Sequence, residues 1–177
     1  MLLQKIVPTI LTQFALPTDG PHGPAHWERV LTNARRLARG RDVNEDVLTL
    51  FAVFHDSRRL CEGVDRDHGL RGADYALACR GVLFDLSDPD MDRLHAACAG
   101  HDGLDRHHPD ETVRICWDAE RLDLARLGIR PRAGRMGTRA AGHPSVIDWA
   151  SRRSLRDLPP GFRPSPRRDC PGTGLRR

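Results

Sequence analysis

The sequence predicts an all-α fold, a single bundle of about six to eight helices. Apolar residues recur at spacings of three and four along most of the chain, which is the period of a helix with one buried face. Clusters of Gly, Pro and Asp separate these stretches, as they do in loops between helices. Few β-branched residues alternate with polar ones, so the pattern of a half-buried strand is scarce.

The clusters of Gly, Pro and Asp set the boundaries of the predicted helices. The apolar segment 1–16 is expected to form a short helix with a break near Pro8. The turn-rich residues 17–24 separate it from the rest of the chain. Asn44 is the expected N-cap of the third helix, and Ser87 or the residue after it caps the fifth. The remaining helices are expected over residues 25–38, 45–59, 68–84, 88–100, 111–126 and 146–156.

Composition separates a folded part from a tail. A chain of 177 residues corresponds to about one domain. We expect this helical domain to cover residues 1–156, and the Arg-, Pro- and Gly-rich residues 157–177 to form a disordered tail. Residues 150–177 hold eight Arg and two Asp, so the net charge of +4 comes from this end. Because Phe162 is the one aromatic residue of the tail, nucleic acid is a disfavoured partner.

The five cysteines form no Cys-x-x-Cys pair, and four of them lie in apolar or helix-like stretches. We therefore expect small buried apolar side chains in the reducing cytoplasm, in preference to a disulfide framework or a zinc cage. No stretch approaches the about 20 apolar residues that a membrane-spanning helix needs, so no membrane partner is expected.

Four of the predicted helices place a histidine or an aspartate on their apolar face or directly after it. A buried imidazole or carboxylate is costly unless it is paired or bound to a metal. Any single one of these residues is more often a hydrogen-bonded core group than a ligand. Several of them directed at one core, without thiolates, suit Mn, Fe, Ni, Co or Mg better than structural zinc. The residues concerned are His26, His55, Asp56, His101 and Asp118.

The order and local context of these residues resemble those of the HD-domain superfamily of metal-dependent phosphohydrolases. Residues 26–30, His-Trp-Glu-Arg-Val, resemble the family's first-helix motif. Residues 51–56 resemble its apolar run ending in His-Asp, and residues 118–123 resemble its terminal segment. The resemblance covers residues 23–138, where we expect the core of the metal site, and it is to a small stand-alone member.

The resemblance implies a role for each site residue. Asp56 would be the central catalytic residue and would bridge two metals where a second one binds. His68 and His101 would hold that second metal, or would hold the phosphate or act as general acid. The implied metal ligands are His26, His55, Asp56 and Asp118.

Three arginines complete the implied site, each with a surface ion pair as its alternative role. They are the implied substrate-phosphate contacts Arg59, Arg29 and Arg121. His22, in a Gly- and Pro-rich loop close to His26, is a further candidate that lies outside the motifs.

The implied function is hydrolysis of a small phosphate ester, a nucleotide or a related phosphomonoester or phosphodiester, through metal-activated water. The cofactor would be one or two divalent ions. The alternative is a non-catalytic protein of the same fold that binds a nucleotide or a metal and signals through a protein partner. The apolar N-terminal segment could pair with a second copy of the chain, which would give a homo-oligomer.

Overall fold

The computed structural model describes residues 2–156 together with Leu158 and Cys170. Within these residues the chain forms seven α-helices and two short 3₁₀ helices, so the predicted all-α class and helix number are confirmed. None of the described helices is both long and apolar enough to cross a membrane. Most of the predicted tail, residues 157–177, lies outside the described residues. The elements are α1 (Leu2–Leu11), α2 (Pro24–Ala38), α3 (Glu45–Phe54), α4 (His68–Cys79), α5 (Asp88–Gly100), α6 (Glu111–Arg121), η1 (Leu124–Leu127), η2 (Ala133–Arg135) and α7 (Pro144–Arg156).

Polar side chains start two helices where the sequence predicts. The side-chain oxygen of Asn44 precedes α3 and accepts hydrogen bonds from the backbone N–H groups of Asp46 and Val47. The hydroxyl of Ser87 precedes α5 and accepts one from the N–H of Asp90. These contacts satisfy backbone donors that have no partner inside the helix. Both predicted N-caps are therefore confirmed.

Helices α3, α4 and α6 end earlier than predicted. Gly81 follows α4 with a φ of +77°, a left-handed conformation in which an α-helix does not continue. After α6, the N–H of Asp123 donates to the carbonyl of Glu120, three residues back, so the chain tightens into 3₁₀ geometry. Because α3 stops early, His55 and Asp56 lie in a turn beyond it.

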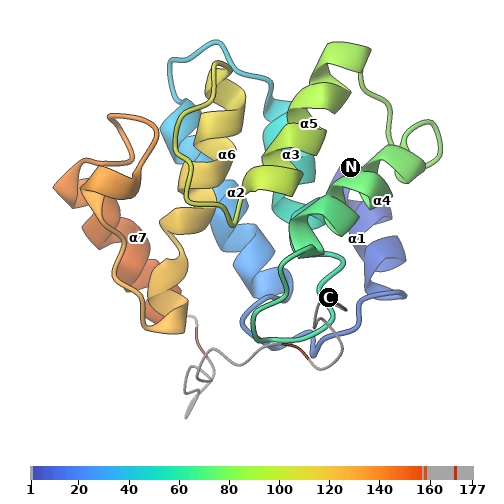
Figure 1. Cartoon of the computed structure of the whole chain (residues 1–177), viewed down its shortest axis with the longest axis horizontal. Helices are drawn as coiled ribbons and strands as arrows, with labels where there is room; N and C mark the ends of the chain where they lie inside the picture. The colour runs from blue at the N-terminus through green and yellow to red at the C-terminus, as the bar shows by residue number, and fades with distance from the viewer. Residues whose placement is uncertain (1, 157, 159–169, 171–177) are drawn as a thin grey trace, which may run out of the picture.

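The core lies between α2, α3, α5 and α6, which pack against one another (Figure 1). The apolar face of α2, with Val30, Ala34 and Leu37, is buried there. Helix α4 packs on α3 and α5, and α7 packs on η1 and α2. Helix α1 runs through Pro8 without the expected break and buries Ile6 in the core. The predicted helix faces are thus the ones that form the core.

Two glycines let α4 approach its neighbours closely. A Cβ atom on Gly72 would lie 2.4 Å from the carbonyl oxygen of Phe54, at the end of α3. A Cβ atom on Gly69 would lie 2.5 Å from the carbonyl oxygen of Cys98 in α5. Both distances are too short for any side chain, so glycine is required for this packing. The close approach brings His68, the first residue of α4, to the ends of α3 and α5.

Two of the five cysteines are paired, and for them the expectation of unpaired cysteines is wrong. Cys61 and Cys170 form a disulfide with Cα atoms 5.8 Å apart, across 109 positions of sequence. The N–H of Cys170 also donates to the carbonyl of Val64, which seats it on the loop after α3. Such a pairing is a tertiary contact that spacing in the sequence does not show. The buried free cysteines, as expected, are Cys79, Cys98 and Cys116.

Candidate metal centre

Five polar side chains meet in the core where four helices begin or end. His26 lies in the first turn of α2, His68 is the first residue of α4, and His101 directly follows α5. His55 and Asp56 occupy the turn beyond α3. At most 3% of any of the five residues is exposed. The structure thus brings together five of the six residues predicted to bind metal or phosphate at the centre.

Asp56 divides this group into two halves. Its Oδ2 lies 3.4 Å from Nε2 of His26 and 3.5 Å from Nε2 of His55, and we call these three groups the first half. Its Oδ1 lies 3.2 Å from Nε2 of His68 and 3.7 Å from Nε2 of His101, which form the second half. In each half the three ligand atoms are close enough together to share one ion.

The two imidazoles of the first half turn their Nε2 atoms toward each other. Nδ1 of His26 donates to the carboxylate of Asp123 at 2.7 Å. Nδ1 of His55 donates to the carbonyl oxygens of Phe51 and Ala52, each at 3.1 Å. With its proton on Nδ1, a neutral ring carries a lone pair on Nε2. The two Nε2 atoms are 3.0 Å apart, so if both carry lone pairs they repel each other, and a cation bound by both relieves that repulsion.

A divalent metal ion fits this requirement. Two nitrogen ligands about 2.1 Å from one ion and at right angles to each other lie about 3.0 Å apart. Asp56 adds a carboxylate oxygen as a third, negatively charged ligand. An Nδ1–H group held by a carboxylate or a carbonyl is the usual support of a metal-binding histidine. The donor set of imidazole and carboxylate suits a first-row divalent ion.

The second half already holds a cation, the guanidinium of Arg59. Its Nη1 donates to Nε2 of His68 at 2.9 Å and lies 3.3 Å from Oδ1 of Asp56. Its Nη2 donates to the carbonyl of Gly63 at 2.7 Å, which fixes the side chain from the loop. Nε2 of His68 also lies 2.9 Å from Nε2 of His101. Arg59, one of the three predicted phosphate contacts, is therefore at the centre.

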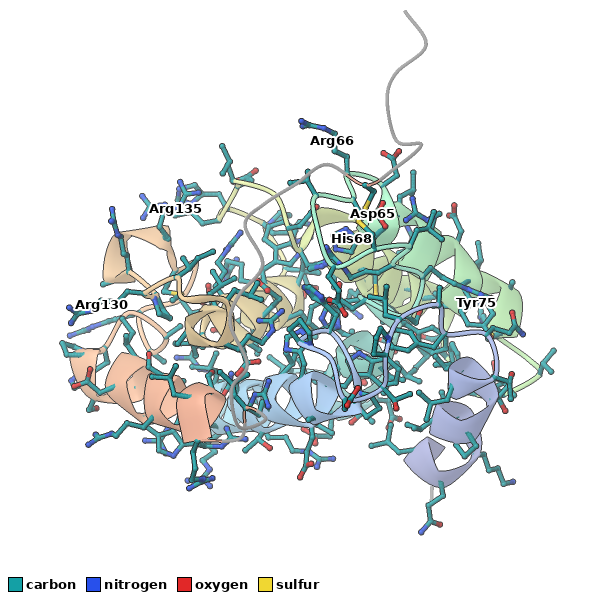
Figure 2. All side chains as sticks on the ribbon, turned by 90° about the horizontal axis from the view of Figure 1, so that it is seen from below. Asp65, Arg66, His68, Tyr75, Arg130 and Arg135 are labelled. Atoms are coloured by element: carbon teal, nitrogen blue, oxygen red, sulfur yellow. A yellow bond between two sulfur atoms is a disulfide. The ribbon has the colours of Figure 1, made fainter. Side chains whose placement is uncertain are left out.

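The loop of residues 60–67 covers the second half. Nδ1 of His68 donates to the backbone carbonyl of Asp65, and Figure 2 shows these two residues together beside the disulfide. The carboxylate of Asp65 accepts hydrogen bonds from the N–H of Leu60 at 2.9 Å and from Arg71 at 2.5 Å. The loop thus has its own internal support, and it orients the ring of His68.

Burial and charge act against each other on the pKa values at the centre. Burial raises the pKa of Asp56, but the surrounding imidazoles and the guanidinium of Arg59 lower it well below its ordinary range. Burial lowers the pKa of His55 well below its ordinary value, although Asp56 opposes this. Asp56 is therefore ionised and His55 neutral, which are the forms that bind a metal.

Asp123 supports the first half from behind. Besides Nδ1 of His26, it accepts hydrogen bonds from Nε of Arg29 at 2.8 Å and from the hydroxyl of Ser154. Burial raises the pKa of Asp123, but the contacts with His26, Arg126 and Arg29 lower it by more than burial raises it. The pKa of Asp123 therefore lies below its ordinary value. Arg29, a predicted phosphate contact, is thus engaged by this carboxylate.

The structure does not bring Asp118 to the centre. Its Oδ1 accepts a hydrogen bond from the N–H of Gly137 at 2.7 Å. Its Oδ2 accepts from the N–H and the hydroxyl of Thr138, at 2.8 and 2.7 Å. Arg121 likewise donates to the carbonyl of Gly103 at 3.3 Å and lies outside both halves. Asp118 and Arg121 instead hold neighbouring loops against α6. No contact among the described residues supports the expected role of Asp118 as a metal ligand or that of Arg121 as a phosphate contact.

The sequence pattern assigns no function to two residues that support the histidines in the structure, Asp123 and Glu62. Asp123 ends the segment Asp-Ala-Glu-Arg-Leu-Asp, and a continuous α-helix would direct it away from the apolar face that carries Asp118. The one feature of the sequence that points to Asp123 is Gly128, because a glycine there indicates that the helix ends close to Asp123. Glu62 lies in a charged loop and contacts the buried imidazole of His22. Loop residues have no periodicity that could select them.

Comparison of the chain with protein-family models, curated proteins and solved structures finds no match. The resemblance to the HD-domain superfamily therefore remains an expectation based on motifs. The chemistry of the centre has to be argued from the contacts of His26, His55, Asp56 and their neighbours.

Proposed function

We propose that the chain is a metal-dependent phosphohydrolase that acts on a small phosphate ester, a nucleotide or a related phosphomonoester or phosphodiester. The observation that carries the proposal is the facing pair of Nε2 atoms of His26 and His55 beside Asp56, which suits a divalent ion. Arg59 offers a guanidinium on the other oxygen of the same carboxylate. A metal position and a phosphate-binding cation side by side are typical of phosphoryl transfer.

Each half then has its own task. A divalent ion bound in the first half supplies a more acidic coordinated water and neutralises charge on the phosphoryl oxygens. Arg59 binds two phosphoryl oxygens at once, because its planar guanidinium matches their geometry. It does so by exchanging its hydrogen bond to His68 for one to the substrate. His68 and His101 are then left beside the phosphoryl group as hydrogen-bonding partners.

The number of ions follows from the position of Arg59. One ion in the first half leaves Arg59 where it is, whereas a second ion at His68 and His101 requires the guanidinium to move away from Oδ1 of Asp56. We therefore propose one resident ion, with the second half receiving the phosphate. Mn, Fe, Ni, Co and Mg all remain candidates for the ion.

The alternative function is a non-catalytic sensor that binds a nucleotide or a metal and acts through a protein partner. A sensor binds the phosphate ligand without turning it over. Binding and hydrolysis measured on the same sample separate the two functions.

The disulfide bears on the expected cytoplasmic location. Disulfides persist mainly in oxidising compartments. A protein kept in the cytoplasm would show five free thiols, and a protein with Cys61 and Cys170 paired would show three. Thiol counting on protein taken from its own cells, with thiols blocked at lysis, distinguishes the two.

Elemental analysis of purified protein tests the metal part of the proposal. We expect about one equivalent of a divalent transition metal in the parent protein, or after incubation with Mn, Fe or Mg. His26→Ala and Asp56→Ala should lose it, and His68→Ala should keep it. The matched control is His143→Ala, since His143 is exposed and contacts Ser145 away from the centre. An empty parent protein, or a fully occupied Asp56→Ala variant, contradicts the proposed centre.

Hydrolysis of a phosphomonoester and a phosphodiester panel tests the chemical part. We expect turnover by the metal-loaded parent protein and at least about 100-fold less by Arg59→Ala, because the variant lacks the phosphate clamp. Metal content should be unchanged in that variant. Metal binding by the parent without turnover of any ester would favour the sensor.

A further inference from the structure

His22 is a buried imidazole beside the centre that belongs to neither half. Its side chain is 4% exposed, and its Nδ1 is hydrogen-bonded to Oε2 of Glu62. Its ring meets the ring of His26 edge to face, with centroids 6.3 Å apart. His22 thus adjoins the first half from the segment between α1 and α2.

The anchoring of His22 follows the same rule as that of the other four histidines. In each of them Nδ1 is held by an oxygen, and Nε2 is left for the centre. In His22 the oxygen belongs to Glu62, and among the described residues no hydrogen bond reaches its Nε2. A histidine whose Nδ1–H is held by a carboxylate presents a lone pair on Nε2. His22 therefore has an acceptor atom that the fold itself does not use.

The side chain of Glu62 is 29% exposed, but the segment that carries His22 covers one of its carboxylate oxygens. A Cβ atom on Gly20 would lie 2.6 Å from Oε1 of Glu62, so the segment that carries His22 closes directly over the carboxylate. Oε1 is buried and has no hydrogen-bond partner among the described residues. Burying a carboxylate oxygen without a hydrogen-bond partner is costly. Glu62 therefore holds Nδ1 of His22 with one oxygen and keeps the other oxygen unpaired.

We propose that His22, held by Glu62, is a catalytic residue of the hydrolysis, whose Nε2 accepts a hydrogen bond from the attacking water and orients it toward the phosphorus. The inference rests on the proposed function. His22 adjoins His26 on the side of the first half, where the water is activated, and Arg59 holds the phosphate on the other side of Asp56. An oriented water keeps its oxygen lone pair directed at the phosphorus while one of its hydrogens is held by the imidazole.

The experiment measures kcat, KM and bound metal for His22→Ala, His22→Gln and Glu62→Ala, with Mn²⁺ as the metal and p-nitrophenyl phosphate and bis(p-nitrophenyl) phosphate as probes. We expect His22→Ala to lower kcat by about 100-fold with KM within about threefold and metal content unchanged. His22→Gln should recover about tenfold, because its amide oxygen can accept the same hydrogen bond. The control is His143→Ala, which should match the parent protein.

A second readout does not depend on turnover. Nitrogen-15 NMR of histidine-labelled, metal-free protein should show the His22 ring with its proton on Nδ1, assigned by the signal that His22→Ala lacks. Glu62→Ala should remove the preference for that position, since no carboxylate then accepts a hydrogen bond from Nδ1–H. This variant should lose kcat as His22→Ala does.

The outcomes separate this inference from the proposed function. A parent protein that hydrolyses either ester, with unchanged kcat in His22→Ala, overturns the role of His22 and leaves the proposed function standing. Loss of metal in His22→Ala also overturns it, because His22 would then support the metal instead of the water. A proton on Nε2 in the parent protein removes the acceptor and overturns it as well. A parent protein without bound metal and without turnover overturns both.

Discussion

His26 and Asp123 are 97 positions apart in sequence, and Nδ1 of the imidazole lies 2.7 Å from Oδ2 of the carboxylate. This hydrogen bond fixes the proton of His26 on Nδ1 and leaves Nε2 directed at His55 and Asp56. It joins the first turn of α2 to the turn between α6 and η1. The geometry of the first half therefore depends on a residue that is not itself a ligand.

Replacement of Asp123 should weaken metal binding without removing a ligand. We expect Asp123→Asn to bind Mn²⁺ about 10- to 100-fold more weakly, because His26 loses the acceptor that orients it. The variant also leaves the buried Arg29 without a carboxylate, so unfolding should cost about 3 kcal/mol less. Chelator competition and urea unfolding measure the two effects. The control is Asp148→Asn, an exposed position on α7, and parental metal affinity in Asp123→Asn would contradict the supporting role.

Replacement of Asp118 should have the opposite pattern. Asp118 accepts three hydrogen bonds from Gly137 and Thr138 and contacts neither half of the centre. We expect Asp118→Ala to keep its metal and to lower the free energy of unfolding by about 1 to 3 kcal/mol, since buried donors lose their acceptor. Metal analysis and denaturation on one sample test this. An empty but stable Asp118→Ala variant would show that the carboxylate is a ligand after all.

Stability should fall in acid partly through Asp110. Burial raises the pKa of Asp110, but Arg93 and the N–H groups of Val113 and Thr112 lower it below its ordinary value. A lowered folded-state pKa adds stability that is complete above the unfolded value of about 3.9 and is lost as the pH falls through the lower folded value.

Asp110→Asn separates the charge from the helix cap, because Asn is an equally good N-cap. We expect a shallower loss of stability below about pH 4 in Asp110→Asn, and a further loss of about 1 kcal/mol at all pH values in Asp110→Ala. Urea unfolding at a series of pH values measures both. Asp92→Asn, exposed on α5, is the control, and an unchanged acid slope in Asp110→Asn would rule out the charge effect.

The disulfide should stabilise the folded chain by restricting the unfolded one. Cys61 and Cys170 close a loop across 109 positions, and a disulfide typically adds about 3 kcal/mol. We expect Cys170→Ser to lose about that amount in unfolding without reductant. Parent protein and variant should unfold alike once reductant is present. Equal stability of the two without reductant, or five free thiols in the native parent protein, would count against the pairing.

The sequence alone determined the class of the fold, the N-caps Asn44 and Ser87, and the convergence of His26, His55, Asp56 and His101, whereas His68 was expected there only from the family resemblance. These features depend on local physics: the helical period brings residues three and four apart to one face, and polar caps start helices at readable positions. Apolar faces must be buried together, so the polar residues on them or directly after them are brought together as well.

Only the tertiary structure decided which carboxylates and loops serve the centre. Asp118 lies on the apolar face but is used by the 137–138 loop, whereas Asp123 reaches His26 because the chain leaves α-helical geometry after α6. The contact of Glu62 with His22 and the disulfide of Cys61 join segments that no local preference brings together. Such contacts are set by how loops close over the packed helices, and loop closure depends on the whole fold and not on the period of any one segment.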